Sequence, residues 1–218
     1  IGITKFCIYP DDWFRSKARI GGTKNANYQK IKALNPDLII GNKEENEKEN
    51  IEQLMAIAPV WMSDISNLDE AMDMISRLGE LLDKKVEANQ MIERIGSNFS
   101  EFSKTRNTSL IGKTALYVIW NNPIISVGEN TFIDDMLRRC GMINYTRESR
   151  YPVFEKTTDV DPDYVFLSSE PFPFKEKHIK KIQLIFPGSI VILVDGELFS
   201  WYGSRLLHAT DYFRKLIK

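Results

Sequence analysis

Aromatic and polar residues gather in loops that directly follow predicted strands. These loops occupy residues 9–14, 121–123, 168–174 and 199–205. In open α/β sheets, ligands bind beyond the carboxyl ends of the strands, where such loops lie. A single loop aromatic is as readily core filler as ligand contact, but the grouping of several favours a binding surface. The chemistry expected there is stacking and hydrogen bonding to a large planar or amphipathic ligand.

The loops supply most of the expected ligand contacts. These contacts are Tyr9, Trp13, Trp120, Glu170, Phe172, Trp201, Tyr202 and Arg205. Prolines at positions 171 and 173 fix φ and lower the entropy of their loop. Phe172 and Phe174 are therefore expected to be held in place before a ligand arrives.

The sequence contains no complete enzyme signature. His178 and His208 are its only histidines, and neither stands beside a serine or cysteine in a nucleophile-elbow context. Residues 112–114 (Gly-Lys-Thr) do not complete a phosphate-binding loop, because Asn107 stands where the leading glycine belongs. Two histidines cannot build a three-histidine metal site. We therefore expect no enzyme activity, no resident metal and no cofactor, so that any metal would arrive in its own chelate.

Composition excludes several classes of partner. The 218 residues carry 29 Lys and Arg against 30 Asp and Glu, a formal net charge of -1, so no nucleic acid or anionic membrane is expected to bind. Cys7 and Cys140 are too few for a disulfide scaffold or a cysteine-ligated metal. No apolar run approaches the roughly 20 residues of a membrane span. The chain starts at Ile1 without a signal peptide, and we expect that a preceding segment has been removed.

Strand and helix signals alternate on both sides of a helical segment, which predicts two α/β lobes with central sheets of parallel type. The expected strands are residues 1–8, 38–40, 114–120, 164–167 and 190–194, and the expected helices are residues 28–34, 132–140 and 204–217. The N-terminal lobe is expected to comprise residues 1–66 and the C-terminal lobe residues 107–218.

Residues 67–106 are predicted to form one long helix between the lobes. Apolar residues recur at helical spacing from Leu68 to Phe102, no proline interrupts them, and Asn67 with Glu70 fits an N-cap. About 36 residues at roughly 1.5 Å each would give a rod of about 50 Å. The alternative is a pair of helices broken at one of the glycines, 79 or 96.

An acidic segment, residues 44–49, opens a helix that continues through Ile51 and Leu54. Carboxylates in a first helical turn are stabilised by the helix dipole, so a solvated helix start is one interpretation. An exposed docking patch for a partner protein is the other.

Five stretches carry a family resemblance. They are IGITKFCIYP at 1–10, GGTKN at 21–25, NPDLII at 35–40, SEPFPF at 169–174 and WYGSR at 201–205. The sequence resembles the helical-backbone metal receptors, substrate-binding proteins of ABC importers, and within them the branch that binds cobalamin and ferric chelates. With the helical segment, the resemblance covers nearly the whole chain. It implies two α/β lobes joined by one rigid helix, with a ligand held between them. The family has another strand and helix before the segment that matches Ile1, so the first lobe is expected to lack both.

The resemblance also implies residue roles. Tyr9 matches a tyrosine that lines the cobalamin cleft, and Trp201 lies in the aromatic loop of the second lobe that does the same. Asn42 takes a ligand-binding place where the cobalamin binder has a tryptophan. A glutamate on each lobe docks on arginines of the permease in this family. Glu47 falls near the first of these glutamates, and Glu197 is a neighbour of the second.

The expected function is capture of a metal-containing small molecule, with cobalamin or a related corrinoid in first place, for delivery to an ABC permease. The protein is expected to be a monomer in the periplasm or another extracytoplasmic space, with a lipid anchor allowed. A ferric siderophore or haem is the alternative ligand, and Arg15, Arg19 and Arg205 would then meet an anionic chelate. Two other classes stay open: a partner-binding module without ligand, and a nitrogenase-like enzyme subunit, which needs more cluster-ligating cysteines than this chain has.

Overall fold

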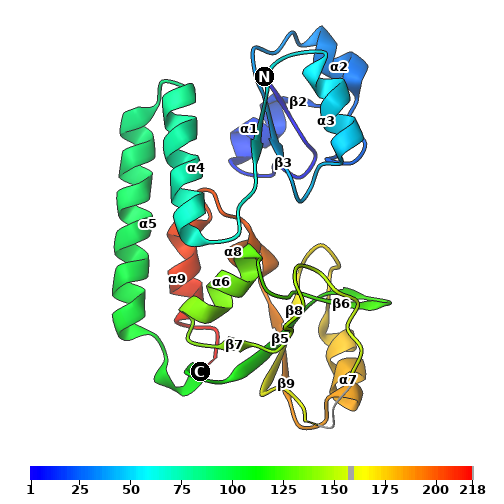
Figure 1. The fold of residues 1–218 in the computed structure, drawn as a ribbon, viewed down its shortest axis with the longest axis vertical. Coiled ribbons are helices and arrows are strands. Elements are labelled where there is room, and N and C mark those ends of the chain that lie inside the picture. The colour runs from blue at the N-terminus through cyan, green and yellow to red at the C-terminus, as the bar shows by residue number, and fades with distance from the viewer. Residues whose placement is uncertain (157–159, 218) are drawn as a thin grey trace. The chain divides into compact units, whose positions relative to one another are not determined.

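Parallel strand pairs build the first of the two units into which the chain divides. The computed structural model describes residues 1–156 and 160–217, and its units are Ile1–Asp64 and Ile65–Lys218 (Figure 1). β1 pairs with β2 and β3 with β4, with a helix between the strands of each pair, as parallel pairing requires a crossover. The elements of this unit are β1 (Gly2–Ile3), α1 (Asp11–Ser16), β2 (Ala18–Arg19), α2 (Tyr28–Ala33), β3 (Ile39–Asn42), α3 (Lys48–Met55) and β4 (Val60–Ser63).

The strand predicted for residues 1–8 is wrong beyond Ile3. The backbone N–H of Cys7 donates to the carbonyl of Thr4, and that of Ile8 donates to the carbonyl of Phe6. These local bonds turn the chain on itself, so its backbone groups are not available to a neighbouring strand. The first parallel pair is therefore only two residues long in each strand.

A five-stranded sheet organises the second unit. Its strand order is β6-β5-β8-β9, and β7 pairs with the first residues of β5. β6 is antiparallel to β5, whereas the other pairings are parallel. The strands are β5 (Thr114–Asn121), β6 (Ile124–Ser126), β7 (Ile143–Asn144), β8 (Tyr164–Ser168) and β9 (Ile190–Val194), and the helices are α4 (Leu68–Leu81), α5 (Lys85–Thr105), η1 (Thr108–Leu110), α6 (Phe132–Arg139), α7 (Glu176–Ile185), α8 (Gly196–Ser200) and α9 (Leu206–Phe213). The α/β fold class predicted from the sequence is confirmed.

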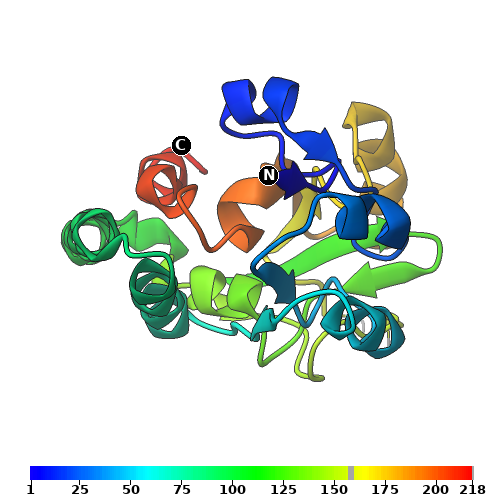
Figure 2. The ribbon, with the colours of Figure 1, turned by 90° about the horizontal axis from the view of Figure 1, so that it is seen from above.

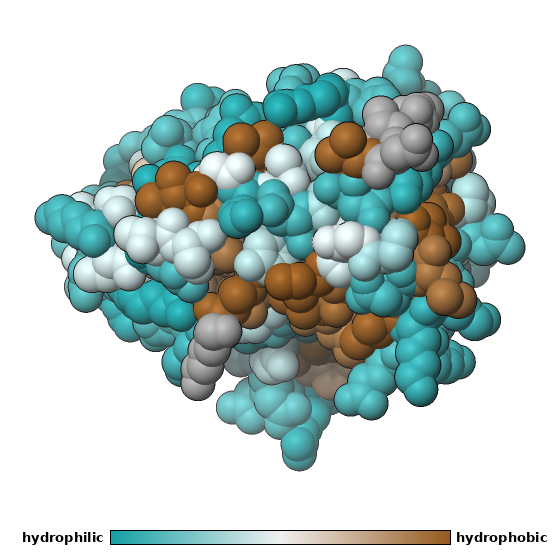
Figure 3. All heavy atoms as spheres, turned by 90° about the horizontal axis from the view of Figure 1, so that it is seen from below, coloured by the Kyte–Doolittle hydropathy of each residue, from teal (hydrophilic) through white to brown (hydrophobic). Residues whose placement is uncertain are grey.

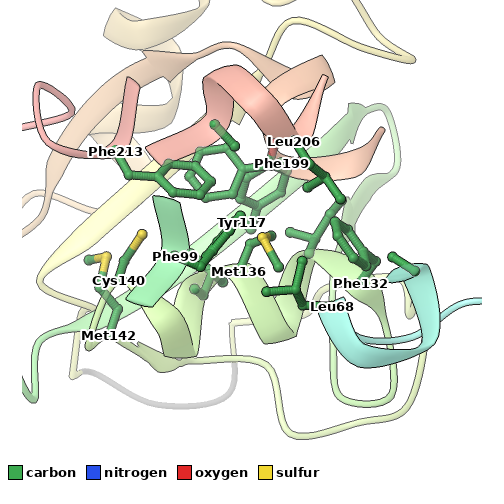
Figure 4. Packing of buried hydrophobic residues seen from close by; sticks show 14 of the residues in the cluster. Leu68, Phe99, Tyr117, Phe132, Met136, Cys140, Met142, Phe199, Leu206 and Phe213 are labelled. Atoms are coloured by element: carbon green, nitrogen blue, oxygen red, sulfur yellow. The ribbon is translucent and has the colours of Figure 1, made fainter. Parts of the chain in front are cut away.

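The core of the second unit lies on both faces of this sheet. Alternate residues of a strand point to opposite faces, so Tyr117 and Phe166 pack on one face while Leu116 and Leu167 pack on the other. Helices α4, α5, α6, α8 and α9 cover the first face, and α7 covers the second. Figure 4 shows the first face, where Phe99, Met136 and Phe199 converge on Tyr117.

The single long helix predicted for residues 67–106 is wrong. Two helices, α4 and α5, are present instead, and α5 runs back beside α4 (Figures 1 and 2). The chain reverses at residues 82–84, where Asp83 adopts the left-handed conformation with φ of 54°. The predicted N-cap is confirmed, because Asn67 Oδ1 accepts a hydrogen bond from the Glu70 N–H at 2.9 Å. Both helices pack in the core of the second unit.

Gly79 explains why the two helices meet so closely beside the turn. A Cβ at this position would lie 2.4 Å from the Cβ of Ala88 on α5. Only glycine therefore permits this approach of the backbones. Gly96, in contrast, lies inside α5, and apart from the adjoining backbone of α5 no described atom lies within 4 Å of the position that its Cβ would take.

We expect the two glycines to respond oppositely to alanine. Gly79→Ala should lower the free energy of unfolding by about 1–3 kcal/mol, because the added methyl group would overlap Ala88. Gly96→Ala should raise it by about 0.5–1 kcal/mol, because alanine favours the helix and finds open space. Urea unfolding followed by circular dichroism measures both changes. Equal shifts in the two variants would contradict the helical hairpin.

Large apolar side chains also reach the surface of the second unit. Leu184 is 84% exposed, Val160 72% and Ile190 55%. Figure 3 shows apolar side chains gathered near the middle of the face that is seen from below.

Across residues 1–156 and 160–217, no helix combines the length and the hydropathy needed to cross a membrane.

Candidate ligand-binding site

Three loops meet at the carboxyl edge of the five-stranded sheet, following the neighbouring parallel strands β5, β8 and β9. Backbone hydrogen bonds tie the loop after β8 to both neighbouring strands. The N–H of Phe172 donates to the Ile119 carbonyl at 3.3 Å, and the N–H of Ser169 donates to the Val194 carbonyl at 3.0 Å. The strand order thus brings the sequence-predicted Trp120, Glu170, Phe172 and Trp201 onto one edge of the second unit.

Glu170 is the polar centre of this edge. Its Oε1 accepts hydrogen bonds from Trp201 Nε1 at 2.7 Å and from the Ser200 hydroxyl at 2.8 Å. Among the described residues, no group donates to its second oxygen, Oε2. Gly196 makes this arrangement possible, because a Cβ there would lie 2.7 Å from Cγ of Glu170. One oxygen therefore fixes the carboxylate and the other can accept a hydrogen bond from a ligand.

Burial raises the pKa of the Glu170 carboxyl above its ordinary value. The hydrogen bonds from Ser200 and Trp201 favour the charged form and oppose part of this shift, whereas the negative charges of Glu197 and Asp195 add to it. The folded protein thus binds the Glu170 proton more tightly than the unfolded chain does. Protonation of Glu170 stabilises the fold, and this contribution is lost as the pH rises above the ordinary value of 4.5 through the folded-state pKa.

A Glu170→Gln variant is expected to gain thermal stability relative to the wild type as the pH rises. The amide oxygen of glutamine still accepts the bonds from Ser200 and Trp201, but the side chain carries no charge at any pH. The difference in Tm between variant and wild type should therefore be larger at neutral pH than near pH 4.5. Differential scanning fluorimetry across this range measures it, with the exposed Glu148→Gln as matched control. A variant that loses stability as the pH rises would contradict the assignment.

Aromatic rings flank Glu170 on the β5 side. Trp120 and Phe172 meet edge to face with centroids 5.7 Å apart, and Phe172 stands 4.7 Å from Phe174. His178 lies against Phe172 at 5.3 Å and accepts a hydrogen bond from the Lys175 N–H at Nδ1. Trp120 is 40% exposed, so this cluster offers an accessible ring face supported from beneath.

Tyr202 and Arg205 are engaged within the protein. Tyr202 packs edge to face on Phe132 at 5.3 Å between centroids. Arg205 Nη2 forms an ion pair with Glu197 at 2.9 Å and lies 3.9 Å from Asp195. The Arg205 guanidinium is thus paired with these carboxylates. The roles of Arg205 towards an anionic chelate and of Glu197 towards a permease stay predictions.

The predicted site residues of the first unit differ in accessibility. Tyr9 and Trp13 are each 56% exposed, and the Lys17 ammonium lies 5.9 Å from the Trp13 ring centroid. Asn42 is half-buried, and its Oδ1 accepts hydrogen bonds from the backbone N–H groups that follow β3. It therefore shapes the loop, and its role towards a ligand stays a prediction. Glu47 is the N-cap residue of α3, with an exposed side chain.

The sequence interpretation missed two contributors to the site. Ser200 bonds Glu170, and His178 supports Phe172. Only their positions beside predicted loop aromatics could have indicated them.

Within residues 1–156 and 160–217, no group of three or more His, Cys, Asp and Glu side chains is placed to hold a metal ion.

Both the sequence and the fold of this chain match known proteins. Residues 2–186 match the family described as periplasmic binding protein. The chain belongs to this family. Among curated periplasmic binding proteins, the vitamin B12-binding protein of Yersinia pestis (strain Pestoides F) is 22% identical over 153 residues, which are 70% of this chain and 54% of that protein. The chain thus spans about half the length of the curated relatives it matches.

Solved periplasmic binding proteins share the fold. A possible iron-binding (periplasmic solute-binding) protein from Staphylococcus epidermidis has a TM-score of 0.82 at 18% identity, over 100% of this chain and 90% of that chain. A periplasmic heme-binding protein from Pseudomonas aeruginosa has a TM-score of 0.80 at 19% identity, over 99% and 84%. The family resemblance predicted from the sequence is confirmed.

Proposed function

We propose that this chain captures a metal-containing small molecule for an ABC importer, with a cobalamin-like corrinoid as the preferred ligand. Membership of the periplasmic binding protein family supports the transport role, since relatives include vitamin B12-binding and heme-binding proteins. The observation that carries the proposal is the carboxyl edge of the second unit. There, an oriented carboxylate with one unoccupied oxygen stands beside accessible aromatic rings.

The charge around Glu170 supports the corrinoid over an anionic chelate. The two charged neighbours that act on its carboxylate, Glu197 and Asp195, are both acidic, and the nearby Arg205 is paired with them. Such a surface repels carboxylate or phenolate oxygens and accepts N–H donors. A corrinoid carries many amide groups, which can donate to Glu170 Oε2 while the ring system stacks on Trp120 or Trp201.

A ferric siderophore or haem is the second candidate ligand, favoured by the first unit. Its residues 5–19 hold three cations over aromatic rings: Lys5 at Phe6, Lys17 at Trp13 and Arg19 at Phe14. Arg15 adds a further positive charge, paired with Asp11 at 2.8 Å. Cations of this kind suit the oxygens of an anionic chelate.

Delivery to a permease would use Glu47. Its exposed side chain stands at the N-cap of α3, where an arginine of a partner can reach it. Glu197 would have to exchange Arg205 for a permease arginine.

An enzyme subunit of nitrogenase type is disfavoured, because burial raises the pKa of the Cys140 thiol to about 12 and Cys7 is the only other thiol.

Binding spectra test the proposal. The natively purified protein is examined by native mass spectrometry for a co-purifying chelate. It is then titrated with cyanocobalamin, ferrichrome and haemin while tryptophan fluorescence is followed. Saturable quenching by cyanocobalamin at lower concentration than by the two iron compounds supports the corrinoid. No quenching by cyanocobalamin together with tight binding of an iron compound would reverse the order of ligands, and no binding of any of the three would overturn the transport proposal.

A further inference from the structure

A cavity of about 270 Å³ lies between the end of α5 and the end of α6 in the second unit. Its lining residues are Phe99, Phe102, Ser103, Arg106, Arg138 and Arg139. A single water needs only about 10–15 Å³, so this space is large enough for a small organic molecule. The three arginines are the charged groups that line it.

This cavity is remote from the carboxyl-edge site. α6 ends at Arg139 and leads into β7, which pairs with Thr114 and Ala115 at the start of β5. The cavity therefore stands by the amino edge of the sheet. The eight residues of β5 separate the two edges by about 26 Å.

The positive charge of the cavity exceeds the charge of its carboxylate partners. Arg138 is paired with Asp134, and Arg139 Nε bonds Asp135 at 2.8 Å. Each aspartate also accepts another hydrogen bond, Asp134 from Asn144 and Asp135 from the Leu68 N–H. For Arg106, no carboxylate within the described ranges lies at ion-pair distance. Three guanidinium groups thus have two paired carboxylates between them, and both are already shared. The charge of Glu129 also acts on Arg138, but Glu129 pairs with Arg147 at 3.7 Å.

Most guanidinium donors of the cavity are uncommitted. Arg106 uses Nη1 on the Arg139 carbonyl at 3.2 Å, Arg139 uses Nε on Asp135, and Arg138 uses Nη2 on Asp134. A guanidinium has five N–H donors in a planar fork that matches the oxygens of a phosphate. The carboxyl end of α6 contributes partial negative charge, but the Arg106 bond to the last carbonyl offsets it.

We propose that this cavity binds a phosphate ester. The phosphate oxygens would take the free N–H groups of Arg106, Arg138 and Arg139, and a small apolar substituent would lie against the edges of Phe99 and Phe102. The Arg139 guanidinium already lies 5.8 Å from the Phe99 ring centroid, so charged and apolar contacts occur side by side. The site goes beyond the proposed transport function and does not depend on it.

The test is a calorimetric titration of the full chain with phenyl phosphate at low ionic strength. Arg106→Gln is expected to weaken binding about 10- to 100-fold, because it removes a charged donor, while leaving the aspartate pairs intact. Arg77→Gln on α4, where Arg77 pairs with Asp73, is the matched control and should bind like the wild type. Ser103→Trp fills the cavity from an exposed position without changing its charge, and it should abolish binding.

A second arm distinguishes a soluble ester from a lipid headgroup. Sedimentation with phosphatidylglycerol vesicles, against phosphatidylcholine vesicles, reports headgroup binding. Binding that depends on Arg106 in either arm supports the proposal and identifies the source of the phosphate. Absence of binding in both arms would overturn it, as would equal binding by the wild type and Arg106→Gln.

Discussion

Replacement of Phe199 by alanine is expected to lower the free energy of unfolding of the second unit by about 3–5 kcal/mol. Phe199 on α8 is fully buried, and its ring centroid lies 4.8 Å from that of Phe213 and 5.2 Å from that of Tyr117. It also contacts Phe166 and Tyr212 at 6.2 and 6.3 Å. No neighbouring side chain can fill the volume of a lost ring, so the cavity remains. Urea unfolding followed by near-ultraviolet circular dichroism measures the loss.

Phe6→Ala is the matched control for this prediction. Phe6 lies in the first unit and is 52% exposed, so its truncation should change the free energy of unfolding by less than about 1 kcal/mol. Because Phe199 directly precedes Ser200 and Trp201, its loss should also loosen the loop that orients Glu170. A destabilisation no larger than that of the Phe6 variant would contradict the packing of α8 on the sheet.

Trp201→Ala is expected to weaken ligand binding by about 30-fold or more, equivalent to about 2 kcal/mol. The substitution removes an aromatic face from the carboxyl edge and also the Nε1 donor that holds Glu170 at 2.7 Å. Trp201→Phe separates these effects, because it keeps a ring and removes only the donor, and it should lose less affinity. Calorimetric titration with cyanocobalamin measures both variants.

Trp61→Phe is the control for the tryptophan series. Trp61 is a half-buried residue of β4 in the first unit and lies outside the predicted site. Its replacement should leave the affinity unchanged. Wild-type affinity in Trp201→Ala would remove this residue from the site.

The sequence predicts the sheet of the second unit well and its helical hairpin poorly. β5, β8 and β9 are runs of mostly apolar residues next to turn signals, and such runs depend little on distant contacts. The reversal between α4 and α5 leaves a weaker trace, Gly79, which the sequence offers only as one of two alternative breaks in a single helix. The apolar rhythm continues on both sides of residues 82–84, and these three positions contain neither proline nor glycine. Packing of Gly79 on Ala88 decides the reversal, and that contact requires the folded unit.

The candidate site likewise has features that the sequence predicts and features that it does not. Aromatics at or after strand ends, such as Trp120, Phe172 and Trp201, could be predicted because strand ends and residue types are local properties. The bonds that Ser200 and Trp201 make to Glu170 depend on β8 and β9 being neighbours, which the sequence does not reveal. The pairing of Arg205 with Glu197 likewise depends on the path of α8, and it changes the interpretation of both residues.

β8 has a consequence for how fast a ligand leaves. All five of its residues are buried, and it is hydrogen-bonded to strands on both sides, so its amide protons should exchange with solvent only through global opening. The loop that carries Glu170 starts from this strand. A ligand would thus meet a surface that needs little ordering, and differences in affinity among ligands would arise mainly as differences in residence time.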